Sequence, residues 1–396
     1  YTNIEMLQMA GRAGRPQFDD EGVCVVMTSH DQKRRHEQIL SGECTVESHM
    51  LEHMQEHLNA EIGSQPTMTS LQTCVEWFRA TFLHVRIQRN PVAYRVPKGL
   101  MPAEMSARLD RIPADALRAL SDASMIDLDA DGAGIRSRHL GTLMARSCVK
   151  LPTMCLFREL GASSGAASIL KLLSPADGFK EACVLRVAEK KTLAALNADA
   201  DAIRFPLDGS RKANCTTPAS KVWLLLQVRC SGAPLGEFHG LQPLLLGACR
   251  RIVGAIVKYA ECVELGTLLC AAVAVGKSLE SGAGWYDESL SPFRQLAGVG
   301  AVLATKMRDA SDGSLETFAQ LTTARAESLC GKSVSTALAQ VRSLVDGALV
   351  VDATAGQHGS SPLTVAVRVC AKTHAAGDDA RWVLCVVDGA SRLLMV

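Results

Sequence analysis

One stretch near the start of the chain decides the fold: Gln8-Met9-Ala10-Gly11-Arg12-Ala13-Gly14-Arg15-Pro16-Gln17-Phe18-Asp19. Two arginines lie three residues apart in it, and a glycine directly precedes each of them. A guanidinium keeps its charge and offers a planar fork of donors that matches phosphate oxygens, while glycine lets a nucleotide or another backbone approach closely. An arginine pair alone also fits a helix end with two solvated side chains. The complete run is more specific and predicts a phosphate-binding segment.

The composition is that of a globular chain with several domains. Its 396 residues have room for about two to four domains. The formal net charge is only +1, so any nucleic-acid binding must come from local basic faces. The 14 cysteines include no C-x-x-C and show no disulfide spacing, which favours a reducing compartment. The longest apolar run, residues 265–275, is shorter than the ~20 residues of a membrane span, so we predict a soluble protein with no membrane partner.

The opening run resembles motif VI of the Ski-two-like superfamily 2 helicases, Q-x-x-G-R-A-G-R-P-Q-F-D. The resemblance implies that the run belongs to the second of two RecA-like domains and reaches ATP held by the first. It further implies that Gln8 couples nucleotide to nucleic acid. Arg12 and Arg15 are expected to contact the nucleotide phosphates beside Gly11 and Gly14, with Arg15 as the arginine finger.

The rest of the nucleotide site is expected elsewhere. The chain contains no phosphate loop and no D-E-x-H box. We therefore expect the Mg²⁺ site and most of the ATP contacts in a domain upstream of Tyr1. On this interpretation the chain is a C-terminal fragment that does not hydrolyse ATP alone.

Residues 1–42 are predicted to end the RecA-like α/β domain, and residues 43–148 to form a linker helix and a winged helix. The apolar run 22–28 is typical of a buried strand, and Met50, Met54 and Leu58 fall in one row of the linker helix. A second helical stripe begins at Thr69 or Ser70 and ends before Asn90. Its predicted core positions are Leu71, Cys74, Val75, Phe78, Phe82 and Val85. A helix over about residues 102–123 and strands at 125–128 and 135–138 complete the expected elements of the winged helix.

Two runs narrow the resemblance to the meiotic crossover, or Mer-type, DNA helicases. They are Val75-Glu76-Trp77-Phe78-Arg79-Ala80-Thr81-Phe82-Leu83-His84-Val85-Arg86 and Asn90-Pro91-Val92-Ala93-Tyr94, with Gly99-Leu100 after them. The spliceosomal and activating-signal relatives are similar over the same skeleton.

Two metal-like patterns have simpler interpretations. His49, His53 and His57 recur every four residues, but no further ligand is in view, so a solvated ridge is the better interpretation. The turn Asp127-x-Asp129-x-Asp131-Gly132 imitates a calcium loop, yet its twelfth position is Arg138, where calcium needs a bidentate glutamate. We predict no metal site in this chain.

The remaining residues resemble the Sec-sixty-three homology module of the same helicases. Residues 149–289 are expected to form a helical bundle, and the helix over residues 241–260 to be the ratchet helix that touches strand phosphates. Arg250, Arg251 and Lys258 would make those contacts, although plain surface charge is the alternative. Residues 290–346 contain a helix-hairpin-helix pattern in which Gly298 and Gly300 would expose backbone N–H groups to DNA phosphate, or form an ordinary turn. The alternation in residues 347–396, at 364–369 and 382–387, predicts a truncated immunoglobulin-like β-sandwich.

The sequence therefore predicts a multidomain, mainly α protein. Its expected function is the C-terminal part of an ATP-dependent 3′-to-5′ DNA helicase of meiotic recombination, acting in the nucleus on single-stranded and branched DNA. Expected partners are the first RecA-like domain and recombination proteins. The same architecture acting on RNA is one alternative, and a motor-dead nucleic-acid- or protein-binding module is another.

Overall fold

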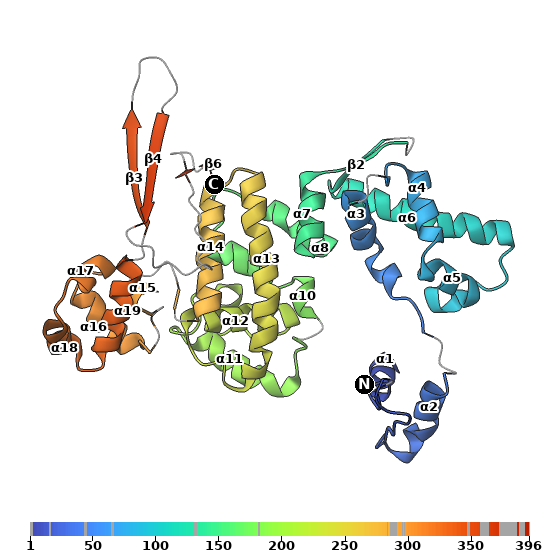
Figure 1. Cartoon of the computed structure of the whole chain (residues 1–396), viewed down its shortest axis with the longest axis horizontal. Coiled ribbons are helices and arrows are strands. Elements are labelled where there is room, and N and C mark those ends of the chain that lie inside the picture. The colour runs from blue at the N-terminus through green and yellow to red at the C-terminus, as the bar shows by residue number, and fades with distance from the viewer. Residues whose placement is uncertain are drawn as a thin grey trace. The chain divides into compact units, whose positions relative to one another are not determined.

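The computed structural model describes residues 3–15, 17–42, 46–64, 67–129, 133–180, 183–282, 284–285, 291–294, 296, 298–346, 349–356, 364–371, 386–387 and 393–395. The chain divides into two compact units, Tyr1–Arg138 and His139–Val396. Both consist mainly of helices (Figure 1). The prediction of a mainly α protein is confirmed.

The first unit combines short helices with one β-hairpin. Its elements are α1 (Asn3–Ala10), α2 (His30–Leu40), η1 (Met50–His53), α3 (Met54–Ser64), α4 (Leu71–Arg79), α5 (Phe82–Arg89), η2 (Pro91–Tyr94), α6 (Pro102–Asp122), β1 (Ile126–Leu128) and β2 (Ile135–Ser137).

The strand predicted over residues 22–28 is wrong. The segment is extended but lies in no sheet, and Val23, Val25 and Met27 expose 84%, 80% and 95% of their surface. A strand needs a neighbour to pair its N–H and C=O groups. None of the strands in the described ranges pairs with this segment, so its apolar side chains remain in solvent.

The helices and hairpin after residue 46 follow the predicted order. Met54 and Leu58 are buried, and α6 begins at Pro102, where the Glu104 carboxylate accepts a hydrogen bond from the Met101 N–H. Strands β1 and β2 pair antiparallel, with Asp127 opposite Arg136. The nearby ion pair joins Asp127 to the Nε of Arg138 at 2.9 Å, so the arginine at the twelfth position of the calcium-like pattern pairs with the first aspartate. Residues 130–132 of that pattern lie outside the described residues.

The single helical stripe predicted up to Asn90 is broken into two helices, α4 and α5. Thr81 takes an extended conformation (φ −81°, ψ 154°), and its hydroxyl accepts a hydrogen bond from the His84 N–H as the cap of α5. Such a local cap competes with helix continuation. The break rotates the second half of the stripe, so Phe82 and Val85, both predicted in the core, expose 56% and 41% of their surface.

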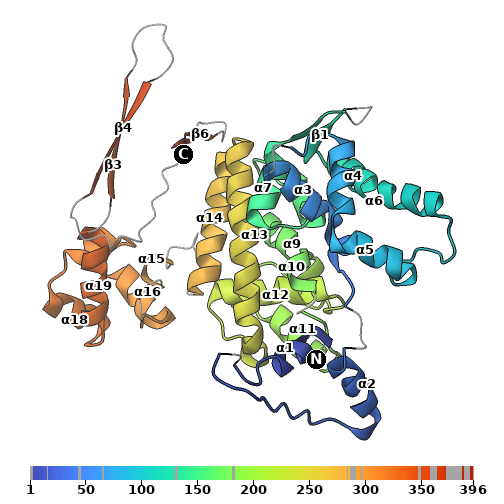
Figure 2. The same cartoon turned by 45° about the vertical axis from the view of Figure 1, so that its right-hand side comes forward.

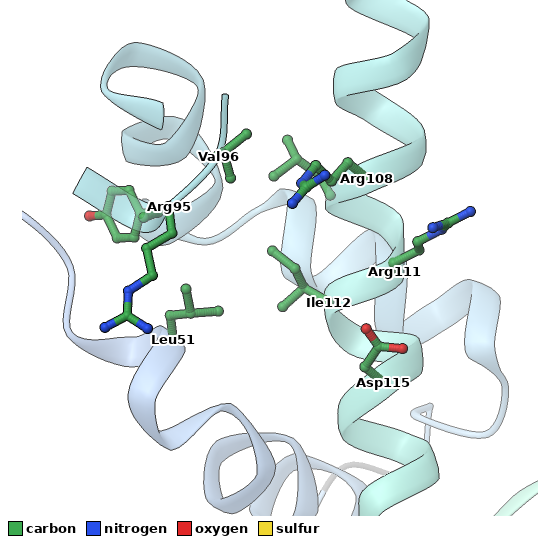
Figure 3. Close-up of a pocket in the computed structure, with 9 residues that line it drawn as sticks. Leu51, Arg95, Val96, Arg108, Arg111, Ile112 and Asp115 are labelled. Atoms are coloured by element: carbon green, nitrogen blue, oxygen red, sulfur yellow. The ribbon is translucent and has the colours of Figure 1, made fainter. Parts of the chain in front are cut away.

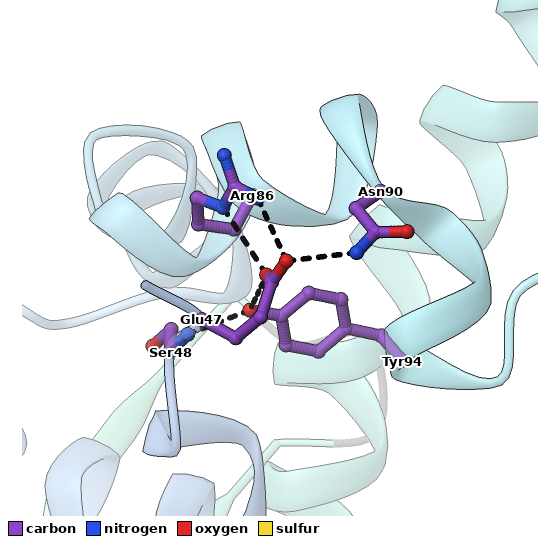
Figure 4. Close-up of polar contacts among 5 residues, drawn as sticks. All are labelled: Glu47, Ser48, Arg86, Asn90 and Tyr94. Carbon is purple, nitrogen blue, oxygen red and sulfur yellow. Dashed lines mark hydrogen bonds and ion pairs between the residues drawn. The ribbon is translucent and has the colours of Figure 1, made fainter. Parts of the chain in front are cut away.

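A carboxylate cluster joins the segment before η1 to α5 and η2 (Figure 4). Glu47 accepts hydrogen bonds from Arg86 Nη2 at 2.7 Å, Asn90 Nδ2 at 2.8 Å and the Tyr94 hydroxyl at 2.8 Å. The Tyr94 oxygen in turn accepts the Ser48 N–H at 2.7 Å. The hydrogen bonds from Arg86 and Asn90 lower the pKa of Glu47 to about 2. This cluster therefore holds residues 47–48, just before η1, against α5 and η2.

We expect Glu47→Gln to destabilise the first unit by about 2 kcal/mol at neutral pH, because the hydrogen bonds to a charged partner are weakened. The folded pKa lies below the ordinary value of 4.5, so the stabilisation is present above that value and is lost as the pH falls toward 2. Urea unfolding of wild type and variant at several pH values checks this. The difference should shrink in acid, whereas the exposed Glu52→Gln change should have little effect at any pH.

The second unit is larger. Its elements are α7 (His139–Ser147), α8 (Leu151–Leu156), η3 (Phe157–Glu159), α9 (Ala166–Leu173), α10 (Asp177–Lys180), η4 (Val187–Glu189), α11 (Lys190–Ala198), η5 (Leu207–Gly209), α12 (Pro218–Ser231), η6 (Gly236–Leu241), α13 (Gln242–Cys262), α14 (Gly266–Ser281), α15 (Ser291–Arg294), α16 (Ala301–Asp309), α17 (Leu315–Ala319), α18 (Thr323–Cys330), α19 (Val334–Asp346), β3 (Leu349–Gly356), β4 (Thr364–Ala371), β5 (Val386–Val387) and β6 (Leu393–Met395).

The long helix α13 packs along α14, and both views show the two side by side (Figures 1 and 2). By length and composition, residues 236–262 are apolar enough to span a membrane. However, Leu245, Ile252 and Ile256 are buried in the protein, whereas Arg251 and Lys258 are exposed on the other side. This two-sided pattern is that of a core helix with one polar face.

A buried lysine ties η4 to α12. The Lys221 side chain is 2% exposed, and its Nζ donates to Glu189 Oε2 at 2.7 Å and to the Val184 carbonyl at 3.0 Å. Burial acts to raise the pKa of Glu189, but the hydrogen bonds from Lys221 and from the Arg186 N–H, together with the positive charges of both residues, outweigh it and the pKa is lowered. The pair is a structural cross-link between segments 32 residues apart in sequence.

Residues 291–346 form a small helical group with its own core. Phe293 of α15 packs edge-on against Phe318 of α17, and Leu296, Val299 and Met307 are buried in the same cluster. Beyond it, β3 pairs with β4 and β5 with β6, both antiparallel. The strand predicted at 364–369 is therefore present in β4, whereas most of the one predicted at 382–387 lies outside the described residues.

Candidate nucleotide and nucleic-acid site

The predicted phosphate-binding segment connects α1 to the extended residues 22–28, and its backbone turns back on itself. Gly14 has φ 89°, a left-handed conformation that favours glycine. After this turn, the Arg15 N–H donates to Asp19 Oδ2 at 2.8 Å. Gly22 returns against the Ala13 carbonyl, where an added Cβ would lie only 2.2 Å from the oxygen. The backbone thus holds the two arginines on a compact loop.

The predicted nucleotide-contacting side chains all face solvent. Gln8 is exposed on α1, Gly11 follows its last turn, and Arg12 and Arg15 are exposed on the loop. Within the described ranges neither guanidinium has an ion pair or a side-chain hydrogen bond. Two free cations on a glycine-containing turn fit the phosphates of a nucleotide, because the donors carry no competing partner.

The three predicted cations of α13 differ in their surroundings. Arg250 pairs with Glu280 of α14, its Nη2 lying 2.7 Å from Oε2, and this hydrogen bond lowers the pKa of Glu280. Lys258 pairs with Glu261 one turn later at 2.7 Å. Both cations are exposed and both pairs lie at the surface, where ion pairs are weak, yet the pairing leaves less charge for a ligand.

Arg251 lies beside a polar hollow of about 140 Å³ lined also by Lys150, Thr153, Asp177 and Gly178. A Cβ at Gly178 would approach Arg251 Nη2 to 3.1 Å, so the glycine leaves room for the guanidinium. The buried Thr153 hydroxyl accepts the Asp177 N–H at 3.2 Å and orders the wall. Across the part of the chain that is described, neither Lys150 nor Arg251 has an ion pair or a side-chain hydrogen bond. The structure thus adds Lys150 to the predicted cations.

The predicted hairpin glycines lie just before α16. Gly298 and Gly300 are exposed, a Cβ added at either would meet no described atom within 4 Å apart from its chain neighbours, and Gly300 is the N-cap residue of α16. Leu296 precedes both glycines and Val299 lies between them, and both of these apolar side chains are buried in the core. The backbone at these two glycines is therefore exposed.

Comparison with known proteins agrees with this architecture. A family model described as the Winged Helix-turn-helix domain matches residues 47–130. A second, described as the Sec63 Brl domain, matches residues 137–394, well over half of the chain. The chain belongs to the Sec63 Brl domain family. The Sec63 Brl match begins close to the start of the second unit at His139 and covers α7 to β6.

Individual relatives of this Sec63 Brl protein are named as helicases. A probable ATP-dependent DNA helicase HFM1 of Xenopus tropicalis is 34% identical over 57% of the chain and 17% of its own length. An ATP-dependent DNA helicase homolog MER3 of Arabidopsis thaliana is 30% identical over 84% of the chain and 30% of its own length. The ATP-dependent DNA helicase MER3 of Saccharomyces cerevisiae is 29% identical over 62% and 20%. The predicted resemblance to a Mer-type, Ski-two-like helicase region is confirmed, and the chain spans less than a third of these relatives.

Proposed function

We propose that this chain is part of an ATP-dependent 3′-to-5′ DNA helicase of meiotic recombination that works in the nucleus. The relatives named as DNA helicases support this, and so does the joint presence of the winged helix and the Sec63 Brl domain. The observation that carries the proposal is the pair of exposed arginines, Arg12 and Arg15, on a turn that precedes these two domains; neither side chain has a partner among the described residues.

In the proposed reaction this chain supplies charge and strand contacts. Bound ATP with Mg²⁺ supplies the energy of phosphoryl transfer. Arg12 and Arg15 hold the nucleotide phosphates, and Arg15 stabilises the charge that develops on the transferred group. Gln8, exposed on α1 just before the turn, couples nucleotide binding to the nucleic-acid strand. The other nucleotide contacts belong to the first RecA-like domain of the full-length protein.

Strand contacts are proposed along α13 and at the hairpin before α16. Arg251 and Lys150 bind one phosphate at their shared hollow, Arg250 and Lys258 add weaker contacts, and the N–H groups around Gly298 and Gly300 bind another phosphate.

The proposal also includes the boundaries of the domains within this chain. They are the end of a RecA-like domain in residues 1–42, a linker helix and winged helix in 43–148, a helical bundle in 149–289, a helix-hairpin-helix in 290–346 and a partial immunoglobulin-like sandwich in 347–396.

Replacing Arg251 by alanine should weaken binding of single-stranded DNA and lower the salt dependence of affinity by about one unit. Lys150→Ala should also weaken binding, because Lys150 lines the same hollow. Fluorescence anisotropy with a labelled oligonucleotide at several salt concentrations measures the slope. Lys171→Ala removes an exposed lysine on α9 and should leave the slope unchanged. If the slope is unaltered in Arg251→Ala, Arg251 does not contact the strand and α13 only supports the fold.

The choice of DNA over RNA is tested by unwinding. The full-length helicase should separate a duplex with a 3′ DNA overhang in the presence of ATP and act poorly on the matched RNA duplex. Unwinding of RNA alone would favour the spliceosomal type of activity. Absence of ATP-dependent unwinding on both substrates would favour a binding module without a motor.

A further inference from the structure

A hollow in the first unit is not used by the proposed strand path. It has a volume of about 320 Å³ and lies between α6 on one side and η1 with residues 94–96 on the other (Figure 3). Leu51, Val96 and Ile112 provide apolar surface inside it, and Leu51 and Ile112 are only half-buried. This size is at the lower end of ligand pockets and suits one large side chain.

Arginines lie on both walls of this hollow. Arg95 follows η2 and Arg108 belongs to α6, on the opposite side in Figure 3, with Arg111 one turn further along α6. None of the three has an ion pair or a side-chain hydrogen bond within the described residues. Asp115, the carboxylate among the lining residues, pairs with Arg118 at 2.6 Å. The hollow therefore presents cations that have no acidic partner.

The backbone of Arg95 adopts a strained conformation. Its φ is 59°, in the left-handed region that disfavours residues with a Cβ. Glycine would form the same turn with less strain. A free cation on a strained turn is a feature more typical of binding than of folding.

We propose that this hollow docks an acidic segment of a partner protein, with one large apolar side chain between aspartates or glutamates. The apolar side chain enters between Leu51 and Ile112, and the flanking carboxylates pair with Arg95 and Arg108 on the two walls. A nucleic-acid backbone would pair with the same arginines but would leave the half-buried apolar surface exposed to water. The charge and the apolar surface together favour a peptide, and the inference does not depend on the helicase activity.

The test uses a fluorescein-labelled peptide with one phenylalanine between two acidic residues on each side. Anisotropy with the 396-residue chain should show saturable binding. Replacing the phenylalanine by alanine, or the acids by their amides, should weaken it. Arg108→Glu should weaken binding of the parent peptide at least about tenfold, because a paired cation becomes a repelling anion. Arg89→Glu, an equal charge change at an exposed position outside the hollow, should leave affinity within about twofold.

Arg95→Gly separates binding from folding. It relieves the strained turn, so the unfolding midpoint should stay the same or rise, while peptide affinity falls about tenfold. No saturable binding of the peptide to the wild-type chain, or equal affinity of wild type and Arg108→Glu, would overturn the proposal. A larger loss of single-stranded DNA affinity than of peptide affinity in Arg108→Glu would also overturn it and assign the hollow to nucleic acid.

Discussion

Replacing Arg15 by alanine in the full-length helicase should lower ATP turnover by about 10³-fold or more, because an arginine finger stabilises the charge on the transferred phosphoryl group. Arg15 is exposed on the turn after α1 and has no competing partner in the described chain. Nucleotide binding should be largely spared, since the proposed function assigns most of the nucleotide contacts to the first RecA-like domain. Phosphate release measures turnover, and a fluorescent ATP analogue measures binding.

Two further variants sharpen this result. Arg15→Lys keeps the charge but loses the planar fork, so its turnover should lie between wild type and Arg15→Ala. Arg34→Ala removes an exposed arginine of α2 and should leave turnover unchanged. Full turnover in Arg15→Ala would remove the finger role from this residue and leave Arg12 as the candidate.

Replacing Glu189 by glutamine should destabilise the second unit by about 3 kcal/mol, because it leaves the Lys221 ammonium buried without its counter-charge. The lowered pKa of Glu189 means that this stabilisation is present above the ordinary carboxyl pKa and is lost as the pH falls below it. Urea unfolding at neutral pH, followed by circular dichroism, measures the loss. The exposed Glu237→Gln change should have no comparable effect.

A double variant shows whether the buried charge causes the loss. Lys221→Met combined with Glu189→Gln removes both charges and keeps a long apolar side chain beside the Phe238 ring. The combined variant should recover much of the stability lost in Glu189→Gln alone. If Glu189→Gln unfolds at the wild-type midpoint, the pair contributes nothing and the assignment fails.

Local signals predicted much of the secondary structure. The helices α6 and α13 and the pairing of β1 with β2 all involve residues close in sequence. Predictions from neighbouring residues failed where a helix cap interrupted a helix or where a strand needed a partner distant in sequence. Thr81 split one predicted helix into two, and residues 22–28 have no neighbouring strand among those described.

The site was predicted only as a set of residue types. Phosphate binding by the loop that bears Arg12 and Arg15 is a prediction from its glycines and arginines. The sequence did not indicate that Arg250 pairs with a glutamate 30 residues away, or that Lys150 shares a hollow with Arg251. A lysine just before Leu151-Pro152 carries no signal by itself, because its role depends on which helix packs beside it.

By itself the sequence determined the family and the order of the winged helix and the Sec63 Brl domain, and it predicted the role of the arginine-bearing turn, because these depend on motifs and on spacing within a helix or hairpin. Only the tertiary structure decided which cations are neutralised and which remain available. That choice depends on carboxylates brought near by packing, such as Glu280 beside Arg250 and Glu189 beside Lys221. Charge pairing falls off with distance in space, and helix packing sets that distance.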